Sequence, residues 1–364
     1  MELCIFGLAV SSAWGNGHAT LWRGLIAALR RMGHRVTFFE RDAPWYAAHR
    51  DLAHLEGCEL RIYRDWDEVR AEAQRAVRRA GASIVTSYCP DGRAAIALVL
   101  EEARLPVFYD LDTPITLDEL DAGRWPAWLP PEGLRGFPLA LSYTGGRALD
   151  LLRDKLGAAQ ARPLYGSVDP DVHSPAAAHP AWRSRLSYLG TYARNRQDGV
   201  NRLFLEPARR LPEARFLLGG SMYPDDLAWP PNMIRVEHVP PSEHAAFYAS
   251  ASLTLNVTRG PMAALGYCPS ARLFEAAACG TPVVSDRWAG LETFFEPGRE
   301  ILLADTAEEV LDALGQSAME LARIGRRARE RALTEHTAAH RARELLQLLD
   351  SARDLPADAA AGGG

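Results

Sequence analysis

Short apolar runs alternate with longer amphipathic stretches along most of the 364-residue chain. Short apolar runs rich in β-branched residues predict buried strands, and apolar residues spaced by three and four predict helices. Between the first two runs, Leu21, Leu25, Ala28 and Leu29 share one helical face, and Gly33 supplies a stop. In the first half, the expected strands are Leu3–Leu8, Arg35–Glu40, Glu59–Tyr63, Ser83–Ser87, Pro106–Asp110, Pro138–Ser142 and Arg162–Tyr165.

The segment from Gly166 to Pro175 interrupts this alternation with Pro, Asp and Ser residues, and we interpret it as a linker. Beyond the linker the alternation of strands and helices starts again. An Ala-, Arg- and Leu-rich helical region closes the chain from about Thr306 to Ala352. In the second half, the expected strands are Leu186–Gly190, Ala214–Gly219, Met233–Glu237, Ser252–Val257, Thr281–Ser285 and Glu300–Leu303.

Strands that are separated by helices form parallel, doubly wound sheets. The pattern on the two sides of the linker therefore predicts an α/β protein with two Rossmann-like domains facing an interdomain cleft. We expect an N-terminal domain over 1–170, a C-terminal domain over 180–335, a helix over 336–352 that packs back across the domains, and a disordered tail over 353–364. Ligands of such sheets bind outside the carboxyl ends of the strands.

Composition narrows the functional classes. Hydrophobic residues make up 48% of the chain and charged residues 24%, which is typical of a globular protein. The net charge of −5 disfavours a protein that binds nucleic acid by neutralising phosphates, so we expect no nucleic-acid partner. Five scattered cysteines without a C-x-x-C pair indicate a reducing, cytoplasmic environment rather than disulfides or structural zinc.

Two motifs in the first half of the chain are candidates for binding a nucleotide or a metal ion. The loop Gly15-Asn16-Gly17-His18-Ala19-Thr20 lacks the third glycine of a dinucleotide fingerprint, which disfavours a nicotinamide dehydrogenase. Glu40 ends the second strand as either a ribose-binding acid or an exposed strand end. The pair Asp110-Leu111-Asp112 either holds a divalent metal or turns the chain before Thr113-Pro114. No P-loop motif is present in the sequence, which excludes a P-loop kinase or ATPase.

The most informative stretch runs from Pro269 to Asp286. It predicts a helix that is entered through Pro269-Ser270 and ended by Gly280, followed by a buried strand. Free N–H groups and the positive dipole end at the start of a helix bind diphosphates. Glu275 lies on this helix, where it either accepts hydrogen bonds from ribose hydroxyls or is a solvated acid paired with Arg272.

This stretch, together with residues 288–292 and 295–303, resembles the nucleotide-binding half of GT-B glycosyltransferases. It is most similar to their CgeB-like group, which is related to the superfamily of glycogen synthases and bacterial mannosyltransferases. The Gly-rich first loop, the turn Gly33-His34-Arg35-Val36, and Val168-Asp169 with Pro175 extend the resemblance to the first domain and the hinge. The resemblance implies a glycosyltransferase that moves a sugar from a nucleotide-diphosphate donor to an acceptor hydroxyl, with no metal and no further cofactor.

The resemblance also implies which residues hold the donor. Glu275 is assigned to the ribose, and arginines after the strands are assigned to the phosphates. Many retaining members carry two glutamates with seven residues between them, and Tyr267 stands here in place of the first, so the usual sugar-contacting carboxylate is missing. The donor-binding candidates are Gly15, Gly17, Arg194, Arg196, Gly220, His238, Val239, Arg259, Tyr267, Ser270, Arg272, Leu273 and Glu275.

The catalytic candidates lie in the first domain. The loop that carries His18 looks like the first-turn loop of inverting GT-B enzymes, which implies that His18 takes the acceptor proton while Asp110 or Asp112 orients it. Alternatively, His18 caps the helix or fills the cleft wall. Two rival functions remain, a GT-B-fold nucleotide-sugar epimerase and a non-catalytic sugar-nucleotide-binding protein.

The acceptor is not specified by the sequence. The aromatic segment Trp125-Pro126-Ala127-Trp128 either lines an acceptor site or packs in the core. The helix around residues 21–35 carries Arg23, Arg30 and Arg31 beside an apolar face, which suits either peripheral membrane contact or packing on the sheet.

Overall fold

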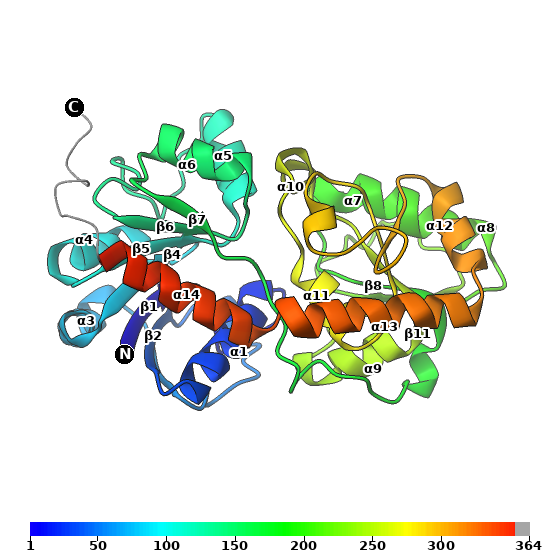
Figure 1. Cartoon of the computed structure of the whole chain (residues 1–364), viewed down its shortest axis with the longest axis horizontal. Coiled ribbons are helices and arrows are strands. Elements are labelled where there is room, and N and C mark those ends of the chain that lie inside the picture. The colour runs from blue at the N-terminus through cyan, green and yellow to red at the C-terminus, as the bar shows by residue number, and fades with distance from the viewer. Residues whose placement is uncertain (354–364) are drawn as a thin grey trace. The chain divides into compact units, whose positions relative to one another are not determined.

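The computed structural model describes residues 1–353, which form two compact α/β units (Figure 1). Unit 1 comprises Met1–Tyr165 together with the last helix, α14 (Ala338–Arg353), and unit 2 comprises Gly166–Thr337. The chain therefore leaves unit 1, completes unit 2, and returns to unit 1. Of the predicted disordered tail, only Arg353 is described, as the last residue of α14, and residues 354–364 lie outside the described part.

Unit 1 is built on a seven-stranded parallel sheet in the order β3-β2-β1-β4-β5-β6-β7. The seven predicted strands are confirmed to within two residues at each end. The strands are β1 (Glu2–Gly7), β2 (Arg35–Arg41), β3 (Cys58–Tyr63), β4 (Ala82–Thr86), β5 (Pro106–Asp110), β6 (Leu139–Ser142) and β7 (Ala161–Pro163).

Helices connect these strands and cover the two faces of the sheet (Figure 1). Before α14, the helices of unit 1 are α1 (Gly17–Arg31), α2 (Pro44–Ala47), α3 (Trp66–Arg79), α4 (Gly92–Glu102), α5 (Thr113–Asp121) and α6 (Arg147–Leu156). The apolar sides of α3, α4 and α6 pack on one face of the sheet, and those of α1 and α14 pack on the other.

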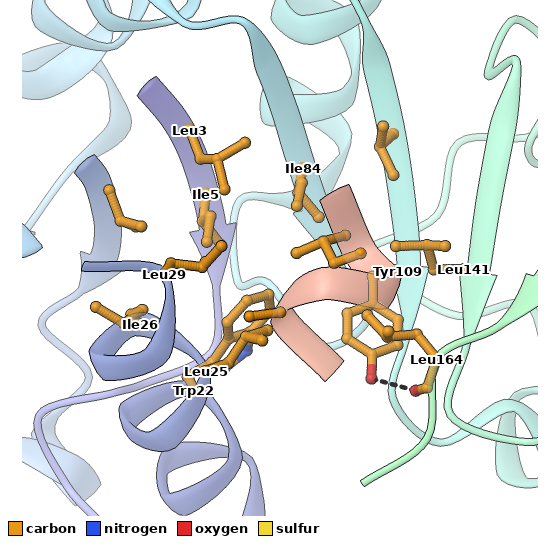
Figure 2. Packing of buried hydrophobic residues seen from close by; sticks show 14 of the residues in the cluster. Leu3, Ile5, Trp22, Leu25, Ile26, Leu29, Ile84, Tyr109, Leu141 and Leu164 are labelled. Atoms are coloured by element: carbon orange, nitrogen blue, oxygen red, sulfur yellow. Dashed lines mark hydrogen bonds between the residues drawn. The ribbon is translucent and has the colours of Figure 1, made fainter. Parts of the chain in front are cut away.

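The core between α1, α14 and the sheet is shown in Figure 2. Trp22 and Leu25 of α1 are almost completely buried there, as are Leu345 and Leu349 of α14. In the same layer the Tyr109 hydroxyl donates a hydrogen bond of 2.7 Å to the carbonyl of Leu164 (Figure 2). The apolar face of α1 is thus buried by packing within unit 1.

Unit 2 has a six-stranded parallel sheet in the order β10-β9-β8-β11-β12-β13. The six predicted strands are again confirmed to within two residues at each end. The strands are β8 (Ser184–Leu189), β9 (Phe216–Gly219), β10 (Met233–Val236), β11 (Ala251–Asn256), β12 (Val283–Ser285) and β13 (Leu302–Leu303).

The helices of unit 2 include a π-helical insert, η2 (Asn201–Leu205), between α7 (Arg194–Val200) and α8 (Glu206–Arg210). The closing helical region is divided into α12 (Ala307–Gly315), α13 (Ala318–Glu335) and α14. The remaining α-helices of unit 2 are α9 (His244–Ala249), α10 (Gly260–Leu265) and α11 (Ala271–Ala278). Unit 2 also contains the short 3₁₀ helices η1 (Pro180–Trp182), η3 (Pro241–Glu243) and η4 (Leu291–Thr293). Within residues 1–353, every helix falls short of the length and apolar character needed to cross a bilayer.

Both sheets reverse their strand order once, which marks where a ligand is expected. In unit 1 the reversal lies between β1 and β4, and in unit 2 it lies between β8 and β11. The loops that follow these four strands at their carboxyl ends are therefore the first places to look for a functional site.

Candidate functional site

In unit 1, a polar cluster lies at the carboxyl ends of β1, β4 and β5. His18 follows β1 in the first turn of α1, Tyr88 follows β4, and Asp112 follows β5. His18 Nε2 lies 3.8 Å from Asp112 Oδ2, and the His18 and Tyr88 rings are 5.9 Å apart. The non-glycine residue Tyr88 has a φ of 62°, a strained conformation that is most common near functional sites. The structure thus brings His18 to one of its two proposed carboxylate partners.

The other proposed partner, Asp110, lies beneath this cluster and is completely buried. Its Oδ1 accepts a hydrogen bond of 3.1 Å from the backbone N–H of Asp112, while its Oδ2 has no partner among the described residues. Burial raises the pKa of the Asp110 carboxyl to about 6, although the Asp112 N–H acts in the opposite direction. Asp110 therefore supports the turn that presents Asp112 to His18.

The glycine-containing loop before α1 is held by Asn16. Its Oδ1 accepts from the backbone N–H of His18 at 3.1 Å, and its Nδ2 donates to the carbonyl of Ala9 at 3.1 Å. Asn16, and not His18, is thus the cap of α1. Gly15 adopts a φ of 62°, whereas a Cβ at Gly17 would meet nothing within 4 Å. This loop fixes the backbone from which the His18 side chain projects.

Of the two interpretations of Glu40, a ribose-binding acid or an exposed strand end, the structure contradicts the second. Glu40 is completely buried at the carboxyl end of β2 and accepts hydrogen bonds from the N–H groups of Val10 at 2.7 Å and Ser11 at 2.9 Å. The Ser11 hydroxyl donates a further hydrogen bond to the same carboxylate. Glu40 thus satisfies the backbone of the loop that follows β1.

In unit 2, two arginines lie together at the carboxyl end of β8. Arg272 of α11 donates through Nε to the carbonyl of Leu189 and through Nη1 to Asn256 Oδ1 at 2.7 Å, and its guanidinium lies 5.0 Å from the centre of the Tyr188 ring. Arg196 of α7 donates through Nη2 to the carbonyl of Thr191. All of these acceptors are neutral oxygens, so these hydrogen bonds bring no negative charge into direct contact with either guanidinium group.

Two further predicted arginines surround this pair. Arg194 is exposed at the start of α7, and Arg259, after β11, donates to Asn195 Oδ1 at 3.1 Å. Burial lowers the pKa of Arg196, with Arg272 and Arg259 adding like-charge repulsion. The loops after β8 and β11 therefore concentrate positive charge at the reversal point of the sheet, which is what a polyanionic ligand requires.

A hydrogen-bonded network behind Arg272 holds it in place, and the sequence analysis did not single it out. Asn256, whose Oδ1 binds Arg272, donates to Ser285 Oγ at 2.9 Å. Asp286 accepts from the Thr258 N–H at 3.0 Å and from the Thr258 hydroxyl at 2.9 Å. Asn256, Ser285 and Asp286 lie at or just beyond the ends of β11 and β12, so a search for polar residues at strand ends would have found them.

The start of α11 is adjacent to this positive cluster. Ser270 occupies the N-cap position with an extended backbone, but its side chain makes no capping hydrogen bond. Ser270 and Ala271 are only partly buried, whereas Arg272 is largely buried and Leu273 is completely buried. Leu273 can therefore contribute to a ligand site only through its backbone. The first turn of α11 remains accessible, and its helix dipole adds to the charge of the arginines.

Glu275 lies one turn further along α11 in a buried polar pocket, so it is not a solvated acid. Its Oε2 accepts a hydrogen bond of 3.1 Å from the Tyr248 hydroxyl and lies 3.9 Å from His244 Nδ1, while its Oε1 lies 4.0 Å from His173 Nε2. Burial alone would raise the pKa of Glu275, but His173, His244, Tyr248 and Arg272 together lower it. Burial also lowers the pKa of His244 to about 4.

Two other donor-site candidates, Gly220 and Tyr267, lie where the backbone is tightly constrained. A Cβ at Gly220 would lie 2.1 Å from the carbonyl oxygen of Gly190, so Gly220 permits the loops after β8 and β9 to approach closely. Tyr267 has a φ of 48° and donates its N–H to the carbonyl of Ala289 at 2.7 Å. Its ring packs against Gly290, where a Cβ would lie 2.4 Å away. The hydrogen bond and the ring contact of Tyr267 thus stabilise the turn that precedes α11.

The remaining candidates differ in exposure. His238 is partly exposed after β10, and Val239 is buried, with its carbonyl 3.1 Å from His244 Nε2. Of the two tryptophans considered for acceptor binding, Trp128 is a core residue stacked on Phe108 at 5.5 Å. Trp125 is 43% exposed and lines a surface pocket of about 220 Å³ with Leu120, Gly123, Arg124 and Lys155.

Comparisons with known proteins found a partial family match and similar solved structures. Residues 194–347, which are less than half of the chain, match the family described as "Glycosyl transferase-like". The matched segment contains Arg194, Arg196, Arg272 and Glu275. No match was found among curated protein sequences.

Solved structures share the fold along nearly the whole chain. Sucrose-phosphate synthase from Thermosynechococcus elongatus superposes with a TM-score of 0.71 at 16% identity, over 96% of this chain and 98% of that one. An α-glucosyltransferase in complex with UDP and DNA gives 0.66 at 14% identity, over 96% and 99%. HepE from Anabaena in complex with UDP-glucose gives 0.63 at 13% identity, over 96% and 100%. The chain therefore has the GT-B fold, as the sequence predicted.

Proposed function

We propose that the chain is a glycosyltransferase that takes its sugar from a nucleotide-diphosphate donor. The observation that carries this proposal is the pair of guanidinium groups, Arg196 and Arg272, whose protein hydrogen bonds go only to neutral oxygens next to the first turn of α11. A diphosphate would supply the missing negative charge. Two of the solved structures that share the fold contain UDP or UDP-glucose, which makes a uridine nucleotide the first donor to test.

In this proposal unit 2 binds the donor. Arg196 and Arg272 contact the diphosphate, Arg194 and Arg259 add positive charge at the edge of the site, and the N–H groups that open α11 contact a phosphate oxygen. Glu275 accepts hydrogen bonds from the ribose through the lone pairs that Tyr248 leaves free. The backbone at His238 and Val239 contacts the base. We also propose that the chain belongs to the CgeB-like group, which residues 269–286 resemble.

Unit 1 activates the acceptor. His18 Nε2 accepts the proton of the acceptor hydroxyl as its oxygen bonds to the anomeric carbon and the bond from that carbon to the diphosphate oxygen breaks. Asp112, 3.8 Å away, stabilises the imidazolium that forms. The nucleoside diphosphate departs with the electron pair, and its developing charge is neutralised by the arginines. Because guanidinium groups can perform this neutralisation, we propose that transfer requires no metal.

Donor binding is tested by calorimetry with UDP on the full chain. We expect binding that weakens by about 10- to 100-fold in Arg196→Gln, since one charge-assisted contact to a phosphate contributes about 1.5–3 kcal/mol. The matched control is Arg209→Gln, which removes an exposed arginine from α8 in the same unit and should leave the affinity unchanged. Equal affinities of Arg196→Gln and the unmodified chain would remove Arg196 from the donor site.

Turnover separates transfer from the two rival functions. Nucleotide release from UDP-sugars is measured with and without candidate acceptors in the presence of a chelator. Release that depends on the acceptor supports transfer, isomerised donor indicates epimerisation, and binding without turnover indicates a non-catalytic sensor. If no nucleoside diphosphate or nucleotide sugar binds at all, the proposal is wrong.

A further inference from the structure

The surroundings of Glu275 contain a second group of chemically active side chains, of which the proposed donor site uses Glu275 alone. His173 lies between β7 and β8, His244 begins α9, and Glu275 lies in α11, and all three belong to unit 2. Their side chains are 1%, 12% and 7% exposed. Three segments that are far apart in the sequence thus bring two imidazoles and one carboxylate together away from solvent.

The spacing of their polar atoms is that of a metal-ligand set. His173 Nε2 lies 3.2 Å from His244 Nδ1 and 4.0 Å from Glu275 Oε1, and His244 Nδ1 lies 3.9 Å from Glu275 Oε2. Ligand atoms about 2.0–2.1 Å from a tetrahedral zinc ion are about 3.3–3.4 Å from each other. The two Glu275 distances are to different carboxylate oxygens; with one ligand atom from each residue, all three atoms lie within 4.8 Å of one another. Side-chain rotations therefore have to bring the widest pair closer by at most about 1.5 Å.

We propose that His173, His244 and Glu275 bind one divalent transition-metal ion of the zinc class. Two imidazoles and one carboxylate form a set that suits zinc, whereas magnesium and calcium prefer oxygen ligands alone. This site goes beyond the proposed transferase activity, which does not require it.

The hydrogen bonds around the three residues prepare them for this role. His244 Nε2 lies 3.1 Å from the carbonyl of Val239, an acceptor, so Nε2 carries the proton and Nδ1 presents its lone pair to His173 and Glu275. The Tyr248 hydroxyl donates to Glu275 Oε2 and orients the carboxylate. Partners of this kind, a carbonyl on a ligating histidine and a donor on a ligating carboxylate, are typical of metal sites.

Among the described residues, the buried side chain of His173 hydrogen-bonds to His244 Nδ1 alone. Its Nδ1 is buried and has no partner among the described residues, and its Nε2 faces only His244 and Glu275. A buried polar atom without a partner costs about 1–3 kcal/mol. A bond from Nε2 to a metal ion would leave Nδ1 as it is, but it would give the buried imidazole a strong interaction and would tie the segment after the linker to α9 and α11.

The test uses the full chain without a purification tag, stripped by a chelator and titrated with Zn²⁺ alone by competition with a chromophoric chelator. We expect one tightly bound ion per chain, with affinity reduced by more than about 100-fold in His244→Gln and in Glu275→Gln. The matched control is His179→Gln, which removes an exposed histidine from the segment that carries His173 and should leave the affinity unchanged.

A second measurement decides the question if a ligand variant fails to fold. Co²⁺ in the site should show the visible bands of a tetrahedral nitrogen–oxygen complex, and Tyr248→Phe should lower the affinity by about 10- to 100-fold. Zinc binding that is unchanged in Tyr248→Phe and in every folded ligand variant, or a cobalt–thiolate absorption, would overturn the proposal. Since no nucleotide is present, failure of this test leaves the donor proposal intact.

If both proposals hold, the ion and the nucleotide share Glu275. We then expect zinc to lower the affinity for UDP, and UDP to lower the affinity for zinc by the same factor, because binding linkage is reciprocal. Independent binding of the two ligands would separate the metal site from the ribose contact while leaving each to stand on its own assay.

Discussion

The buried carboxyl of Asp110 offers a quantitative test of how the strand ends of unit 1 are built. Burial raises the pKa of Asp110 from its ordinary value of 3.8 to about 6 in the folded protein. At 1.36 kcal/mol for each pH unit between the two values, the ionised side chain lowers the free energy of unfolding by roughly 3 kcal/mol at neutral pH. Asp110→Asn removes this ionisation, so we predict that it changes how stability depends on pH.

The sign follows from the order of the two pKa values. Below about pH 4 Asp110 is protonated in the folded and the unfolded chain, and it contributes no ionisation difference. Between pH 4 and 6 the unfolded chain releases the proton first, so this residue makes the protein less stable as the pH rises. Above pH 6 both states are ionised and the full cost of about 3 kcal/mol remains. Between pH 4 and 7, the free energy of unfolding of Asp110→Asn should therefore rise by about 3 kcal/mol relative to that of the unmodified chain.

The comparison is made by urea unfolding at several pH values. Hydrogen-exchange mass spectrometry of the peptide that contains β5 reports on unit 1 separately, which is needed because a chain with two units need not unfold in one step. The new amide adds an unsatisfied N–H at the site of Oδ2, but that cost of about 1–3 kcal/mol does not vary with pH. The test is therefore whether the difference in free energy of unfolding between Asp110→Asn and the unmodified chain changes with pH.

Ser142→Ala is the control, because it alters a neutral, buried strand end in the same sheet. Its effect on the free energy of unfolding should be the same at every pH. If the difference between Asp110→Asn and the unmodified chain stays constant from pH 4 to 7, Asp110 does not titrate with a raised pKa, and the account of its burial is wrong.

Three further predictions concern catalysis, packing and backbone conformation. His18→Ala should reduce turnover by about 10²- to 10⁴-fold and leave the UDP affinity measured by calorimetry unchanged. Asp112→Asn should reduce turnover less. Normal turnover in His18→Ala would exclude His18 as the base. Leu349→Ala should lower the free energy of unfolding of unit 1 by about 2–5 kcal/mol in urea, whereas Leu348→Ala, on a partly exposed side of the same helix, should cost clearly less; equal losses would contradict the assigned packing of α14. Gly220→Ala should destabilise unit 2 and weaken UDP binding, since its Cβ would clash with a carbonyl oxygen; an unperturbed midpoint in urea would show that the two loops separate at little cost.

The sequence predicted the architecture well because apolar periodicity is a local property. The run Pro106–Asp110 is a strand with the predicted bounds, since proline and aspartate delimit a short apolar segment. The same reasoning located the start of α11 and the arginines that follow β8 and β11. His18 became a candidate through the resemblance of its loop to that of inverting GT-B enzymes, and the structure places it 3.8 Å from Asp112, since the loops after β1 and β5 lie at the same edge of the sheet.

What the sequence could not reveal depends on contacts between distant segments. Glu40 is buried because Val10 and Ser11 donate to it, and nothing in the local sequence distinguishes this from an exposed strand end. His173, His244 and Glu275 belong to three separate segments, with 71 positions between the two histidines. The Ala- and Arg-rich pattern after Thr306 predicted a separate helix over 336–352 but no break before it, whereas Ser317 caps a new helix, α13, after α12 has ended at Gly315.

The placement of α14 in unit 1 has a consequence for how the protein matures on the ribosome. Unit 1 contains both β1 and α14, so its hydrophobic layer cannot close until α14 has been synthesised. Unit 2 is one continuous stretch of sequence and can finish folding while the layer over α1, Trp22 and Leu25 is still open. Nascent chains stalled before residue 338 should therefore expose that layer to chaperones, and premature termination there would harm the half of the molecule that was synthesised first.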